Sequence, residues 1–318
     1  MYTILIAGGT GLIGTHLSTF LRKQGHEVRL LSRRPHQVGH LPAFKWDITK
    51  RYIDLAALKG VDTLINLAGA NIANRPWTKG RKAELIASRV AATRLLRDAL
   101  SRQDTLPQRY IAASAIGYYG NSADEWVDEW SQPQSVGFLS TLAQQWEAAA
   151  EEIAALGIPT ARLRIGMVLA REGGTLKPMT FSARLGLAPY FGRGQQWFSW
   201  IHVHDLVHMI YYLIEHRSAT GPWNGVSPNP VQLKVFVKTL AHALGRPAIS
   251  LPIPAKLIRL AMGQMADLLL HSTRVCPRRW LEQTDFQFQH PLLEQALAQL
   301  FSKPKNISGL GAIDGTLP

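Results

Sequence analysis

Short apolar runs alternate with longer amphipathic stretches along about the first 170 residues. The short runs predict strands and the amphipathic stretches predict helices, because the two patterns follow the repeats of extended and helical backbone. Strands are expected at 3–7, 27–32, 63–66, 109–113 and 160–165, with helices at 15–23, 79–100 and 139–156. This alternation predicts an α/β fold, a Rossmann-type doubly wound parallel sheet with a ligand at the carboxyl ends of its strands.

The pattern changes from about residue 171. Glycine, proline and aromatic residues cluster at 187–194 and 197–200, which predicts a small, loop-rich region on the substrate side. A helix is expected at 203–216, and further helices at 255–270, 277–283 and 292–301. We therefore expect a large domain at 1–247 that includes the loops, a small helical domain at 248–301 and a flexible tail at 302–318.

Composition narrows the class of protein. Hydrophobic residues make up 46% of the chain and charged residues 18%, which excludes a disordered chain. The single cysteine, Cys276, cannot form an intrachain disulfide and lies in no activating motif. The first apolar run lacks a basic flank, and no stretch reaches the ~18 apolar residues of a membrane span. We expect a cytoplasmic protein that does not enter the membrane.

The formal charge of +13 invites a comparison with nucleic-acid-binding proteins. The basic residues are spread out, however, and the short pairs Arg33-Arg34, Lys50-Arg51 and Arg278-Arg279 form no tract. Neither zinc-finger spacing nor an RNA-binding aromatic signature is present in the sequence. We expect a solvated basic surface, with a field that attracts anionic ligands, and no nucleic-acid partner.

Three glycines directly after the first predicted strand carry the strongest chemical signal. Gly8-x-x-Gly11-x-x-Gly14 links that strand to the first helix, a turn that lets a pyrophosphate approach bare backbone at a helix N-terminus. The alternative is a turn that only packs the helix tightly on the sheet. The cofactor site predicted from this turn comprises Gly8, Thr10, Gly11, Leu12, Ile13 and Gly14.

Two further strand ends extend this site. The second strand ends in Ser32-Arg33-Arg34, where an acidic residue would bind the ribose diol of NAD. A hydroxyl and two guanidinium groups suit a 2′-phosphate instead, which predicts NADP(H); exposed arginines without a ligand are the alternative. The third strand runs into small residues, where backbone lies flat against a cofactor: Leu67, Ala68 and Gly69.

Together these segments resemble the extended short-chain dehydrogenase/reductase superfamily. The similar segments are the glycine turn, Asn66-Leu-Ala-Gly69, Ser114 before Tyr119-Gly120, 163–169 and 200–205. The chain looks most like the atypical "epimerase family" branch of NAD-dependent epimerase/dehydratase-like proteins, whose members bind NADP and carry a short helical C-terminal domain. Segments similar to that branch lie at 66–72, 117–120, 146–147, 192–197, 200–202, 224–228 and 243–247. The resemblance covers residues 1–301.

The resemblance also implies further site residues. It assigns Glu84, Arg89 and Val168 to the cofactor site, with Arg89 reaching a phosphate or ribose; an exposed helix pair is the alternative for Glu84 and Arg89. It places His202 beside the substrate. The spacing of His202 and His204 before an aspartate makes a poor zinc site, so no metal is expected. Members often pair through helices beside the sheet, which leaves a homodimer open.

The chain departs from the superfamily at its proton-transfer pair. That pair is a tyrosine four residues before a lysine, and the helix near 138–147 holds Phe138 and Leu142 in one register and Leu139 and Ala143 in the other. No Tyr-x-x-x-Lys occurs anywhere in the sequence.

Ser114 and Tyr118 are the predicted replacement donors, with Glu147 as another acid, and a buried structural role is the alternative for each. Two hypotheses follow. The first is an NADP(H)-dependent oxidoreductase or epimerase-like isomerase of unknown small-molecule substrate, and the second is a silent NADP(H)-binding sensor or interaction module.

Overall fold

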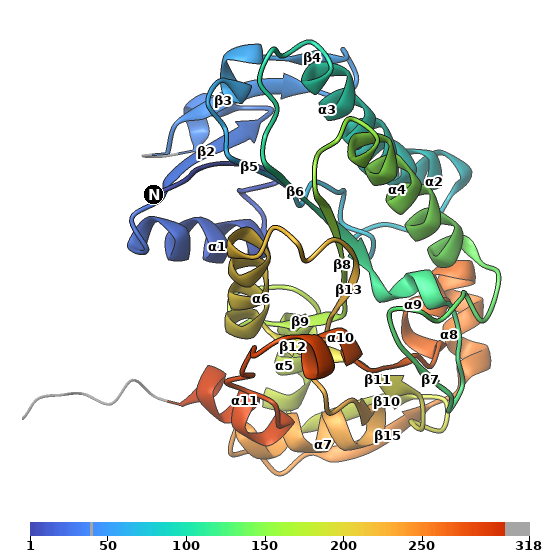
Figure 1. Cartoon of the computed structure of the whole chain (residues 1–318). Helices are drawn as coiled ribbons and strands as arrows, with labels where there is room; N and C mark the ends of the chain where they lie inside the picture. Colours follow the sequence, from blue (N-terminus) through green and yellow to red (C-terminus); the bar gives the residue numbers. More distant parts are fainter. Residues whose placement is uncertain (39–40, 303–318) are drawn as a thin grey trace, which may run out of the picture.

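The computed structural model describes residues 1–38 and 41–302, and its centre is one eight-stranded sheet (Figure 1). The strand order is β13-β8-β6-β5-β1-β2-β3-β4, and all neighbours are parallel except β3 and β4. The bounds are β1 Thr3–Ala7, β2 Glu27–Ser32, β3 Ala43–Asp47, β4 Tyr52–Ile53, β5 Thr63–Asn66, β6 Arg109–Ala115, β8 Thr160–Ile165 and β13 Gly221–Gly225. The expected Rossmann-type α/β fold is confirmed, and all five predicted strands are present.

Helices cover both faces of the sheet, as alternation along β1 requires. Ile4 and Ile6 pack with one helical layer, and Leu5 and Ala7 pack with the other. The first layer contains α1 (Leu12–Lys23) and α6 (Val203–Glu215). The second contains α2 (Lys79–Ile86), a π-helical turn (Ala87–Ala91), α3 (Ala92–Leu100) and α4 (Phe138–Ala154), seen on the opposite side in Figure 1.

The strand order reverses at β1. The chain continues to β2 and β3 on one side of β1 and then crosses to β5 on the other. Crossover segments that leave neighbouring strands in opposite directions open a crevice at the carboxyl ends, where ligands bind in open α/β sheets. The glycine turn after β1 and residues 67–69 after β5 flank this crevice.

A second lobe follows β8. Here β9 (Met167–Leu169) pairs with β12 (Trp200–His202), β11 (Trp197–Phe198) pairs with β14 (Val231–Gln232), and β10 (Leu187–Phe191) pairs with β15 (Ile249–Ile253). The expectation of loops was wrong at α5 (Leu176–Arg184), whose buried positions 176, 180 and 183 follow a helical repeat. A further helix, α7 (Leu233–Ala243), escaped prediction although its buried positions 233, 236, 237 and 240 have the same repeat.

The carboxyl-terminal region packs onto both lobes. Its predicted helix at 255–270 is interrupted at Gly263, which has φ +54° and separates α8 (Ala255–Met262) from a 3₁₀ turn and α9 (Asp267–Leu270). The strand β16 (Arg274–Val275) pairs with β7 (Trp126–Val127). The remaining helices are α10 (Arg278–Gln283), which buries Trp280 in the core under α6, and α11 (Leu293–Phe301), which packs on α7.

Two sequence expectations remain, one about the C-terminal tail and one about membrane-spanning helices. The expected tail at 302–318 lies outside the described residues except for Ser302. Among the described helices, none is long and apolar enough to cross a membrane.

Candidate functional site

The glycine turn brings α1 as close to the sheet as backbone allows. Gly8 has φ +81°, and a Cβ there would lie 2.7 Å from the carbonyl carbon of Leu67 at the end of β5. A Cβ on Gly14 would lie 2.5 Å from the carbonyl oxygen of Gly8. These two glycines are therefore required for packing, since neither position has room for a side chain.

Gly11 has a different role in the turn. It is the N-cap of α1 with an ordinary φ of −79°, and no side chain caps the helix. The amides of the first helical turn have no intrahelical acceptor and point out of the helix end. A Cβ on Gly11 would meet only the Gly8 oxygen, at 3.3 Å, so the space beyond it is open. A helix N-terminus of this shape suits a pyrophosphate, and the assignment of Leu12, Ile13 and Gly14 to the cofactor site stays a prediction.

The residues after β2 lie at the exposed end of the crevice. The amide of Arg34 donates a 3.1 Å hydrogen bond to the hydroxyl of Ser32, which fixes the turn. The Arg33 and Arg34 side chains are exposed, and within residues 1–38 and 41–302 neither has an ion-pair partner. Both guanidinium groups are thus free to meet an anionic ligand.

The two charged helix residues predicted beside the cofactor differ in their surroundings. Arg81 binds the exposed carboxylate of Glu84 at 2.6 Å and lowers its pKa. Arg89 lies in the π-helical turn and donates a 3.1 Å hydrogen bond to the carbonyl of Ala70. Burial lowers the pKa of Arg89 to about 10, with a smaller effect from the charge of Arg81. Arg89 therefore holds the segment after β5 directly. Glu84 pairs with Arg81, and the charge of Arg33 also lowers its pKa.

Val168, a predicted cofactor residue, is the middle residue of β9. It is half-buried and pairs with Ile201, next to the cavity residue Met167 described below. The loop that follows β9 approaches the glycine turn. A Cβ on Gly174 in this loop would lie 3.3 Å from the side chain of Leu12. The fold thus brings Val168 and Leu12, predicted from distant motifs, to one side of the crevice.

A buried polar network ends the β6 strand. The Ser114 hydroxyl donates a 2.8 Å hydrogen bond to Glu147, and Arg164 donates two hydrogen bonds to the same carboxylate, at 2.7 and 2.9 Å. Arg164 also donates to the hydroxyl of Tyr119, which donates to Asn224. Burial raises the pKa of Tyr119, so its phenol stays protonated. These groups satisfy one another and form a structural network.

Tyr118 packs against the same network. The Arg164 guanidinium lies 3.5 Å from the centre of the Tyr118 ring, and the Tyr118 ring meets Tyr119 edge-on. Neither Tyr118 nor Ser114 lines the cavity described next. Both were predicted proton donors, and their positions do not favour that role.

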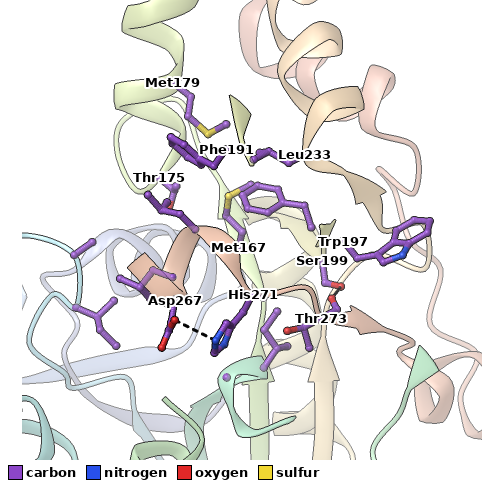
Figure 2. A pocket seen from close by; sticks show the side chains of 18 of the residues that line it. Met167, Thr175, Met179, Phe191, Trp197, Ser199, Leu233, Asp267, His271 and Thr273 are labelled. Atoms are coloured by element: carbon purple, nitrogen blue, oxygen red, sulfur yellow. Dashed lines mark hydrogen bonds and ion pairs between the residues drawn. The ribbon is translucent and has the colours of Figure 1, made fainter. Parts of the chain in front are cut away.

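A cavity of about 580 Å³ lies between the sheet and the second lobe (Figure 2). Its walls are almost entirely apolar, with Met167, Met179, Phe191 and Leu233 contributed by the second lobe. Gly117 and Gly120 after β6 line it from the Rossmann domain. Its polar groups are few: Thr175, Ser182, Ser199, Asp267, His271 and Thr273.

The lining of the cavity shows which residues of α4 face it, a question that the sequence left open between Phe138 with Leu142 and Leu139 with Ala143. Leu139 lines the cavity, whereas Phe138 packs edge-on against Trp77, with ring centres 4.9 Å apart. Leu139, with the buried Ala143 one turn on, therefore occupies the register expected for the tyrosine and lysine. An alkyl group stands where a proton donor was expected.

His202, predicted to contact substrate, lies elsewhere. It is 2% exposed, and its Nδ1 accepts a hydrogen bond from the amide of His204 and so caps α6. Its Nε2 lies 3.0 Å from the Gln299 side-chain oxygen, and its ring stacks on His290. Burial lowers the pKa of His202 to about 3. The substrate-contact prediction is corrected: His202 is a buried capping residue under α11.

Three side chains near His202 bear on the expectation of no metal. Ligand atoms of His204, Asp205 and His290 lie within 4.8 Å of one another, a spacing that could hold an ion. Both Asp205 oxygens already accept backbone hydrogen bonds, from Gln289 at 3.0 Å and from His290 at 2.9 Å. Through these two hydrogen bonds the buried carboxylate of Asp205 anchors the segment before α11.

Asp267 and His271 were missed by the sequence analysis. Both line the cavity, and His271 Nε2 lies 3.3 Å from Asp267 Oδ1. Their spacing of four residues is visible in the sequence, but it occurs in many helices and only the fold brings this pair to the cavity.

Comparisons with known proteins show the family to which the chain belongs. The model of the NAD dependent epimerase/dehydratase family matches residues 4–224, and a domain of unknown function (DUF1731) matches residues 253–300. The chain is 36% identical over 306 residues to the epimerase family protein YfhF of Bacillus subtilis (strain 168), a match that covers 96% of this chain and 99% of that protein.

Mammalian relatives are equally similar. The epimerase family protein SDR39U1 of Mus musculus is 37% identical over 297 residues, covering 92% of this chain and 98% of the mouse protein. A crystal structure of human SDR39U1 (isoform 2) with NADPH has a TM-score of 0.84 at 34% identity, covering 94% of this chain and 98% of the human chain. Since the family model spans more than half of the chain, the protein belongs to the NAD dependent epimerase/dehydratase family, whose fold binds a nucleotide cofactor.

Proposed function

We propose that the protein is an NADP(H)-dependent oxidoreductase that acts on an apolar carbonyl compound or the corresponding alcohol. The observation that carries this proposal is the apolar cavity at the carboxyl edge of the sheet, lined on one side by Gly117, Leu139 and Gly166. Those residues follow β6, begin α4 and follow β8, around the crevice where a family member holds its cofactor.

Local chemistry supports NADP(H) as the cofactor. The free Arg33 and Arg34 side chains beside Ser32 suit a 2′-phosphate, and the end of α1 suits the pyrophosphate. The similar human protein was crystallised with NADPH. When bound, the nicotinamide supplies or accepts a hydride. The single cysteine, Cys276, is consistent with the cytoplasmic location that we include in the proposal.

The cavity lining argues against sugar nucleotides as substrates. A sugar ring carries several hydroxyl groups, and burying one without a hydrogen-bond partner costs about 1–3 kcal/mol. The wall formed by Met167, Met179, Phe191 and Leu233 offers no such partner. An apolar substrate with one carbonyl gains from burial on the same wall. The alternative of a silent NADP(H)-binding module rests on Leu139, which stands where the tyrosine was expected.

A substrate screen tests the proposal. NADPH consumption is followed with nonanal, 2-decanone and benzylacetone, and product stereochemistry is followed with UDP-glucose. We expect reduction of at least one apolar carbonyl and no epimerisation. Met179→Glu, which puts a charge on the cavity wall of α5, should abolish turnover while NADPH affinity stays unchanged. Lys177→Glu, exposed on the same helix, is the matched control. Epimerisation of UDP-glucose, or turnover unaffected by Met179→Glu, would overturn the proposal.

A further inference from the structure

Two ionisable side chains lie next to each other, four residues apart in the sequence, in the mostly apolar lining of the cavity. Asp267 begins α9 and His271 directly follows its last residue, with His271 Nε2 3.3 Å from Asp267 Oδ1 (Figure 2). Each side chain is 23% exposed. Among the described residues that line the cavity, these two alone carry an ionisable group.

The backbone around the pair is tied to the Rossmann domain. The amide of His271 donates a 3.1 Å hydrogen bond to the carbonyl of Asp267, which fixes their relative position. The amide of Ser272 donates to the Asn121 side chain at 3.0 Å, and the hydroxyl of Thr273 donates to the carbonyl of Gly120 at 2.8 Å. The residues that follow His271 are therefore held against the loop after β6, which contains Gly120 and Asn121.

We propose that His271, oriented by Asp267, is the proton donor that replaces the missing tyrosine and lysine. This inference rests on the proposed function, because it names the acid of that same reaction. His271 is the catalytic residue, since it would touch the substrate oxygen, and Asp267 is a positioning residue that binds Nε2. Histidine exchanges protons near neutral pH, and a carboxylate on one ring nitrogen orients the other toward its reaction partner.

The ring nitrogen that turns away from Asp267 is Nδ1. Within the described part of the chain it makes no hydrogen bond, so it is free to bind a substrate oxygen. The same is not true of the other candidates: Ser114 already donates its only proton to Glu147, and Tyr118 lies outside the cavity wall. His271 thus combines a free ring nitrogen with a place in the cavity.

The proton balance of the step is simple. During reduction the carbonyl carbon gains a hydride and its C–O π bond breaks, so the electron pair of that bond goes to the oxygen. The doubly protonated imidazole of His271 gives its Nδ1 proton to that oxygen and becomes neutral, with Nε2–H still directed at Asp267. Solvent returns the proton to His271. In the direction of alcohol oxidation, Nδ1 accepts the hydroxyl proton as a general base, and the carbon would give its hydride to the oxidised nicotinamide cofactor of the proposed function.

Turnover of the best carbonyl from the screen tests the donor. His271→Gln should lower kcat by roughly 10²–10⁴-fold, the contribution of a general acid, with NADPH affinity unchanged. His271→Ala should recover part of its kcat when free imidazole is added, which a purely structural role for the side chain would not produce. His242→Gln, exposed on α7 and outside the cavity, is the matched control. Equal kcat in the wild type and His271→Gln would overturn the inference while leaving the proposed function intact.

Binding of decanoate provides a second readout that needs no turnover. An apolar chain with a carboxylate should fill the cavity and place its charge at His271. Calorimetry should show roughly tenfold weaker binding to His271→Gln than to the wild type or to His242→Gln, because a charge-assisted hydrogen bond is lost. Unchanged affinity in His271→Gln, or failure of decanoate to bind the wild type, would overturn the inference even if no carbonyl in the screen is reduced.

Discussion

The hydroxyl of Ser114 donates a 2.8 Å hydrogen bond to the buried carboxylate of Glu147, which in turn is held by Arg164. Ser114 lies near the end of β6, the position of the catalytic serine in the wider superfamily. Here its neighbours Glu147 and Arg164 form an ion pair whose side chains are about 95% buried. The hydroxyl is committed to the fold, so in the proposed reaction the proton comes from another part of the cavity lining.

The ion pair gives a stability prediction. Glu147→Leu leaves the Arg164 charge buried and unpaired, so the free energy of unfolding should fall by about 3–5 kcal/mol. Glu151→Leu, one turn along α4 on a half-exposed carboxylate that pairs with Arg162, should cost only about 0–1 kcal/mol. Urea denaturation of the two variants measures both. Losses of equal size would show that the buried network is not what holds β6, β8 and α4 together.

A second prediction separates the two groups of candidate donors. Ser114→Ala combined with Tyr118→Phe removes both hydroxyls near the end of β6 but leaves the cavity wall unchanged. We expect the double variant to keep kcat for an apolar carbonyl within about tenfold of the wild type, well short of the loss expected from a general acid. Steady-state kinetics with NADPH decide this. A loss of 10³-fold or more would return the donor role to Ser114 or Tyr118.

The parts of this fold that the sequence predicted correctly depend on local patterns. The five predicted strands are short apolar runs. Gly8 and Gly14 were recognisable because a helix that packs closely against a strand end requires glycine at the points of backbone contact. The strand β13 was not predicted, and its first two residues, Gly221 and Pro222, are residue types typical of turns. It is a strand nonetheless, since it lies at the sheet edge and pairs only with β8, where a proline is tolerated.

The site was less predictable because tertiary contacts assemble it. Asp267 and His271 lie far along the chain from Gly117 and Gly120, and nothing local indicates that all four line one cavity. The register of α4 was ambiguous for a similar reason: Phe138 and Leu139 are both apolar. Only the contact of Phe138 with a ring from another loop leaves Leu139 to face the cavity.

The glycine turn predicts a contrast between two substitutions. Gly11→Val should abolish NADPH binding while the far-ultraviolet circular dichroism stays close to that of the wild type, because a side chain there enters the ligand space and clashes little with the protein. Gly14→Val should lower thermal stability strongly, since its Cβ would lie 2.5 Å from backbone atoms of Gly8 and Gly9. Retained NADPH affinity in a folded Gly11→Val protein would remove the turn from the cofactor site.

Cofactor preference gives the next prediction. Arg33→Ala combined with Arg34→Ala should weaken NADPH binding by roughly 10–100-fold, the value of charged hydrogen bonds to a phosphate, and leave NADH binding nearly unchanged. Arg102→Ala removes an exposed arginine far from β2 in the sequence and serves as the control for net charge. Fluorescence titration of each variant with both cofactors is the measurement. Equal affinity of the wild type for NADH and NADPH would contradict the assignment.

The buried His202 predicts how stability depends on pH. Burial, aided by the nearby His290, lowers its pKa to about 3, whereas a histidine in the unfolded chain has a pKa of about 6.5. Between these values the unfolded state binds the extra proton. The free energy of unfolding therefore falls as the pH drops below 6.5, by up to about 1.4 kcal/mol per pH unit from this residue, and is insensitive to it above that pH.

His202→Asn isolates this contribution. Asparagine does not titrate, yet its side chain can still accept the capping hydrogen bond from the amide of His204. Between pH 7.5 and pH 5.0 the wild type should lose up to about 2 kcal/mol more stability in urea than His202→Asn, since about 1.5 pH units of that range lie below 6.5. His242→Asn, an exposed histidine on α7, should lose as much as the wild type. If His202→Asn loses as much as well, the imidazole is protonated in the folded protein and its burial is not what sets the acid sensitivity of the fold.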